Sequence, residues 1–93
     1  MIPESTKKFI DNLIDYYINE SSSYKQMAKI YFKETKEIND CTFGIIVGSL
    51  YSGFLQAFQN LKQKPSLEDT QEFTNMIKTR EVQIKKSIVD AKA

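Results

Sequence analysis

Histidine and tryptophan are absent from this 93-residue chain, and cysteine occurs once, at Cys41. Without histidine the chain lacks the commonest general base and the commonest transition-metal ligand. A single cysteine cannot form a disulfide within the chain, which argues against the disulfide-rich scaffold of many small secreted domains. No glycine-rich phosphate loop follows an expected strand. We therefore expect no catalytic residues, no metal site, no cofactor and no enzymatic activity.

Neither positive nor negative charge is in clear excess, and one stretch of the chain has no charged residue at all. Thirteen Lys and Arg residues face twelve Asp and Glu residues, so the net charge of +1 does not point to any class of partner. The stretch 41–61 carries no charged side chain, although 27% of the chain is charged. The first nine residues, MIPESTKKF, lack the apolar run of a signal peptide, so we expect a cytoplasmic protein.

Glycine and proline are scarce, and neither occurs between Glu4 and Phe43. Apolar residues recur at helical spacing from Phe9 to Ile38, Tyr31 and Phe32 among them. The common phase predicts one long helix over 5–39. The stretch 20–23 is rich in serine and predicts instead a break, with Ser23 and Gln26 as a capping box for a second helix. The pattern does not separate these alternatives.

Two further helices are expected downstream. Residues 39–42 resemble a turn, and Asp40 or Thr42 is a candidate cap for a helix over 42–63. Pro65 ends that helix, and Ser66 with Asp69 predicts a capping box for a last helix over 66–92. That helix has a narrow apolar stripe, which consists of Phe73, Ile77, Ile84, Ile88 and Ala91.

The fold class that follows is all-α. We expect a single domain over residues 1–93, a bundle of three long helices, or of four if the first helix breaks near 20–23. A continuous first helix of 35 residues would be about 50 Å long, against about 33 Å for the central one. Part of its apolar face would then lack a partner, so we expect a dimer.

The uncharged central helix could be read as a membrane span, but the distribution of its polar residues argues against that reading. A span needs about 20 predominantly apolar residues. The strongly apolar part, residues 43–58, is shorter and already contains Ser49, Ser52 and Gln56. Except for Ile45, its large apolar residues, Tyr51 among them, fall on one half of the helix. Its hydroxyls and amides, with Gly48 and Gly53, fall on the other half. A membrane is therefore not the expected partner, and a helix covered by protein on both sides is.

Three glycines inside this helix would each cost about 1 kcal/mol relative to alanine. Close approach of a second helix is the natural compensation, because Gly44, Gly48 and Ser52 are four residues apart, as are Ser49 and Gly53. The alternative is a monomer whose glycines only accommodate bulky tyrosine and phenylalanine residues of the first helix. The expected partner interface consists of Gly44, Ile45, Gly48, Ser49, Ser52, Gly53 and Leu55.

The last helix offers a different candidate surface. Its acidic residues come first and its basic residues last, an order that the helix dipole alone explains. The same basic residues are candidates for contact with phosphates of a nucleic acid, namely Lys78, Arg80, Lys85 and Lys86. The first expectation is thus a helical interaction module, either a homodimer or an accessory subunit of a larger protein assembly. The alternative is a nucleic-acid-associated protein.

Overall fold

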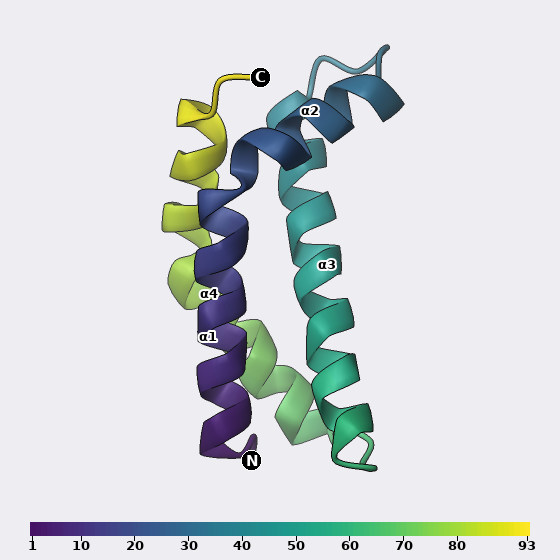
Figure 1. The fold of residues 1–93 in the computed structure, drawn as a ribbon, viewed down its shortest axis with the longest axis vertical. Helices are drawn as coiled ribbons and strands as arrows, with labels where there is room; N and C mark the ends of the chain where they lie inside the picture. Colours follow the sequence, from purple (N-terminus) through teal and green to yellow (C-terminus); the bar gives the residue numbers. More distant parts are fainter.

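The computed structural model describes all 93 residues. It contains four α-helices and no strands. The helices are α1 (Glu4–Asn19), α2 (Ser21–Tyr31), α3 (Ile38–Asn60) and α4 (Leu67–Asp90). The all-α bundle is confirmed, in its four-helix form. In Figure 1, α1, α3 and α4 run broadly along the long axis, while α2 turns away from α1 and crosses one end of α3. The expected dimer stays a prediction.

The continuous first helix over 5–39 is wrong, because the chain bends at Glu20. The serine-rich stretch has weak helix propensity, so a bend there costs little. The bend turns the second half across one end of α3, and the molecule is 39 Å long instead of about 50 Å. Ser21 then donates a hydrogen bond to the carbonyl oxygen of Ser87 in α4. The expected capping box of Ser23 and Gln26 is wrong, since α2 begins at Ser21 with no side-chain cap.

Residues 32–37 connect α2 to α3, and α3 begins at Ile38, four residues earlier than expected. The predicted turn at 39–42 is therefore wrong. Thr42 does not cap the helix but lies inside it, where its hydroxyl donates to the carbonyl oxygen of Ile38 at 2.7 Å. The early end of α2 also leaves Tyr31 and Phe32 exposed, although their spacing assigned them to a buried face.

The turn between α3 and α4 follows the sequence more closely. Lys62 has a left-handed backbone (φ 57°), and the amide of Gln63 bonds back to the carbonyl oxygen of Phe58. This is a Schellman-type ending, which closes α3 at Asn60, before the expected 63. The capping box at the start of α4 is confirmed. The amide of Asp69 donates to Ser66 Oγ at 3.0 Å, and the amide of Ser66 donates to Asp69 Oδ2 at 2.9 Å.

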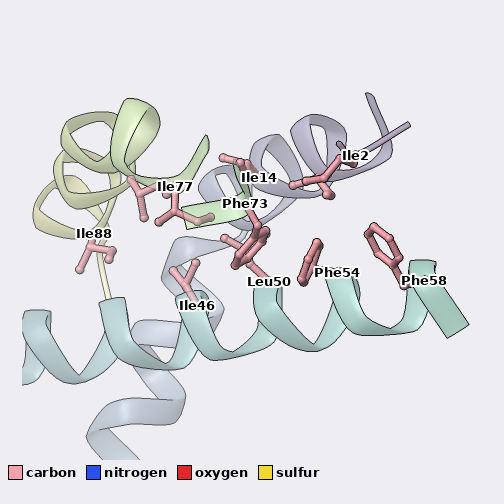
Figure 2. Close-up of a cluster of buried hydrophobic side chains, with 11 residues drawn as sticks. Ile2, Ile14, Ile46, Leu50, Phe54, Phe58, Phe73, Ile77 and Ile88 are labelled. Atoms are coloured by element: carbon pink, nitrogen blue, oxygen red, sulfur yellow. The ribbon is translucent and has the colours of Figure 1, made fainter. Parts of the chain in front are cut away.

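The core lies between α3 on one side and α1 and α4 on the other. Figure 2 shows Leu50, Phe54 and Phe58 of α3 pointing toward Phe73 of α4 and toward Ile2 and Ile14. The rings of Phe54 and Phe73 stack with centroids 4.6 Å apart. The stripe predicted for the last helix is buried in this core at Phe73, Ile77, Ile84 and Ile88.

The amino-terminal segment is held against the first turns of α4. Ile2 is buried, and its amide donates to Glu72 Oε1 at 2.7 Å. Lys7 lies 2.7 Å from the other carboxylate oxygen of Glu72. These two contacts lower the pKa of Glu72, with the Ile2 amide as the larger cause. The amide of Ser66 likewise lowers the pKa of Asp69, and the amino group of Met1, 3.0 Å from Asp69 Oδ1, adds to this effect.

A candidate helix-docking surface on α3

α3 has one covered side and one open side. The covered side repeats every fourth residue and is fully buried, and it consists of Thr42, Ile46, Leu50, Phe54 and Phe58. Between Gly44 and Asn60 eight residues are exposed, and six of them form a continuous strip that we call the outer face: Gly44, Gly48, Tyr51, Ser52, Leu55 and Gln59. The other two, Gln56 and Asn60, continue the row of every fourth residue. The outer face contains no charged side chain, unlike a helix surface that only meets water.

The three glycines of α3 have different surroundings. A Cβ added to Gly53 would lie 2.5 Å from Cδ2 of Leu13, so the end of this α1 side chain packs directly against Gly53. A Cβ added to Gly44 or Gly48 would have no neighbouring atom within 4 Å. Close packing inside the chain therefore explains Gly53 and leaves Gly44 and Gly48 unexplained. The side chain accommodated at Gly53 is a leucine, whereas the sequence suggested tyrosine or phenylalanine.

The structure divides the predicted interface residues into two groups. Gly44, Gly48, Ser52 and Leu55 lie on the outer face. The half-buried residues are Ile45, Ser49 and Gly53, and Ser49 donates its hydroxyl to the carbonyl oxygen of Ile45 within the helix. Tyr51 and Gln59 share the exposed strip but were not among the predicted interface residues. Their positions on the helical wheel were the available signal, but Tyr51 was assigned to the apolar half.

The outer face ends in a groove where α3 meets the turn to α4. This groove has a volume of about 400 Å³ and is lined by Leu55, Gln59, Lys62, Gln63, Lys64 and Pro65. Lys62 and Lys64 are exposed and form no ion pair within the chain. The groove therefore adds positive charge at the carboxyl end of an otherwise uncharged surface.

A second apolar surface lies at the end of α2, where the sequence did not predict one. Met27, Ile30, Tyr31 and Phe32 are all exposed there, Tyr31 by 75%. Met27 lies three and four residues before Ile30 and Tyr31, so the three side chains adjoin on one side of α2. The apolar spacing had assigned most of this set to a buried stripe.

The basic residues of α4 are mostly engaged inside the chain. Arg80 pairs with Asp15 at 2.5 Å, and Lys86 pairs with Asp90 at 2.9 Å, which raises the pKa of Lys86. Lys85 lies over the ring of Phe43, 4.9 Å from its centroid. Lys78 alone of the four predicted contacts has none of these partners. The structure therefore does not bring the four basic side chains together as one free patch.

The chain has no cluster of metal-ligating side chains and has one helix of membrane-spanning length. No group of three or more histidine, cysteine or acidic residues is placed to hold a metal ion. α3 is long and apolar enough, by length and composition, to cross a membrane, and 28% of its most apolar 18 residues are buried inside the chain. Core helices of soluble proteins, which are mostly buried, pass the same test. Comparisons with protein-family models, with curated proteins and with solved structures found no match to this chain.

Proposed function

We propose that this protein is a non-enzymatic helical interaction module that associates through the outer face of α3. It acts as a homodimer or as a small accessory subunit of a larger complex. One observation carries the proposal: Gly44 and Gly48 are open to the surface, and a Cβ at either position would have no atom within 4 Å. Each glycine costs about 1 kcal/mol in a helix, out of a typical total stability of about 5–15 kcal/mol. A helix that settles on this flat surface would offset that loss.

The composition of the outer face supports the same function. Solvent-exposed helices usually carry lysine and glutamate, but the outer face has none over about four turns of α3. Tyr51 and Leu55 are partly exposed on it, which provides apolar area for a partner. Depletion of charge with retention of aromatic and aliphatic side chains is typical of the centre of a protein–protein interface.

The unpaired Cys41 suits a reducing compartment, and we place the protein in the cytoplasm.

Gly48→Leu tests this proposal. Gly48 is exposed and a Cβ there meets no side chain within 4 Å, so helix content by circular dichroism should stay unchanged. It should block close approach of a second helix and shift the protein from dimer to monomer in sedimentation velocity. Gln71→Leu, which adds apolar bulk at an exposed position of α4, is the matched control and should leave the molar mass unchanged. Equal molar masses for wild type and Gly48→Leu would refute the outer face as a self-association surface.

The accessory-subunit form of the proposal predicts a monomeric wild type. In that case a partner captured by the wild type and by Gln71→Leu should be lost with Gly48→Leu.

The alternative, a nucleic-acid-associated protein that uses α4, has less support because Arg80, Lys85 and Lys86 already have partners within the chain.

A further inference from the structure

Six exposed positions on α3 have the same spacing when they are read from either end. From Gly44, intervals of four and three residues lead to Gly48 and Tyr51. From Gln59, the same intervals lead backwards to Leu55 and Ser52. The midpoint of the face therefore lies between Tyr51 and Ser52. A surface with this spacing matches itself when a second copy is turned by a two-fold axis through that midpoint.

From this spacing, and from the unpaired charges at the two ends of α3, we infer that the partner of the outer face is a second copy of the same chain, with the two α3 helices antiparallel. The inference rests on the proposed function and specifies its partner. In this arrangement Leu55 of one copy lies opposite Gly48 of the other, and Gln59 lies opposite Gly44. Tyr51 lies opposite Ser52. Each larger side chain thus meets a small one, as efficient packing of two helices requires.

Charges at the two ends of α3 favour the antiparallel orientation. Asp40 in the first turn and Lys62 and Lys64 beyond the last turn are exposed, and none of them forms an ion pair within the chain. The residues just before α3 add no net charge, because the charge of Lys36 cancels that of Glu37 and the charge of Lys33 cancels that of Glu34. Two antiparallel copies place Asp40 of each beside the lysines of the other, at both ends of the interface.

Two parallel copies would instead place the four lysines together at one end, which is unfavourable. The antiparallel arrangement also opposes the two helix dipoles. It directs the first turn of the partner's α3 toward the groove of about 400 Å³ at the carboxyl end of the outer face. The charges at the two ends of α3 and the helix dipoles therefore favour the same orientation.

Site-directed cross-linking with a short bifunctional maleimide tests the orientation. The wild type has only Cys41, and the variant Cys41→Ser/Gln59→Cys has only a thiol at 59. These positions are about 27 Å apart along one helix, but within one helical turn of each other across the antiparallel dimer. A mixture of the two proteins should therefore give a cross-linked dimer, whereas neither protein alone should. Cross-linking of each protein alone, with none added by mixing, would overturn the antiparallel arrangement in favour of a parallel one.

Charge reversal provides the second test. Asp40→Lys and, separately, Lys62→Glu/Lys64→Glu should each weaken the dimer about tenfold in sedimentation equilibrium at low salt. The variant that combines all three changes should bind within about threefold of the wild type, because the opposite charges face each other again. Absence of this recovery would overturn the inference.

The outcomes also separate this inference from the proposed function. A dimer that Gly48→Leu disrupts, but that cross-links in the parallel pattern, refutes the orientation and leaves the proposed function standing. A chain that stays monomeric at every concentration refutes the second copy as partner and leaves only the accessory-subunit form of the proposal.

Discussion

The two open glycines of α3 make a quantitative prediction for the stability of the isolated chain. Nothing lies within 4 Å of a Cβ at Gly44 or at Gly48, so a methyl group would meet only solvent there. Each Gly→Ala change should then recover the helix propensity of alanine, about 1 kcal/mol, without any packing cost. Gly44→Ala/Gly48→Ala should add about 2 kcal/mol to the free energy of unfolding. For a domain of this size that raises Tm by about 10 °C.

Gly53→Ala is the matched comparison on the same helix. Its methyl group would lie 2.5 Å from Cδ2 of Leu13, so the gain in propensity should be largely offset by displacement of that side chain. The assay is urea and thermal denaturation, followed by circular dichroism at a concentration where sedimentation shows monomer. A double variant at 44 and 48 that is no more stable than Gly53→Ala would refute the assignment of these glycines to an open surface.

Two further predictions concern the ends of α3 and α4. Lys62 adopts a left-handed backbone, which strains any residue with a Cβ. Lys62→Gly should therefore stabilise the monomer by about 1 kcal/mol in urea denaturation, whereas Lys62→Ala should not. Equal effects of the two substitutions would contradict backbone strain at this position. The pKa values of Asp69 and Glu72 are lowered in the folded chain, from ordinary values of 3.8 and 4.5. Their stabilising contribution is therefore complete above those values and is lost as the pH falls through the lower folded values. Glu72→Gln should flatten the fall in the urea midpoint between about pH 5 and pH 2, and an unchanged slope would show that Glu72 does not contribute.

The candidate surface was only partly predictable from the sequence. The absence of charge between Cys41 and Leu61 marked α3 as unusual, and the spacing of its small residues placed Gly44, Gly48 and Ser52 on one side. The same spacing argument grouped Gly53 with the expected interface, although Leu13 of α1 already occupies that position. Wheel positions describe which residues share a side of a helix, but they do not tell which neighbouring helix covers that side.

Local features of the sequence alone determined that the chain is helical and where α4 begins. Apolar spacing marked Phe73, Ile77, Ile84 and Ile88 as core, and the hydroxyl of Ser66 with the carboxylate of Asp69 made the cap. Such features depend on residues within one or two turns of each other, so a sequence pattern contains them completely.

Only the tertiary structure decided the direction of α2 and which apolar residues beyond Glu20 are buried or exposed. A continuous helix and a bend at Glu20 have similar local free energies, since serine is a mediocre helix former in either case. The choice is made by long-range contacts such as that between Ser21 and Ser87, and by burial of Ala28. Once α2 turns across the end of α3, Ile30 and Tyr31 face outward and one side of α3 has no cover. The exposed surfaces are therefore a consequence of how four helices share a small core.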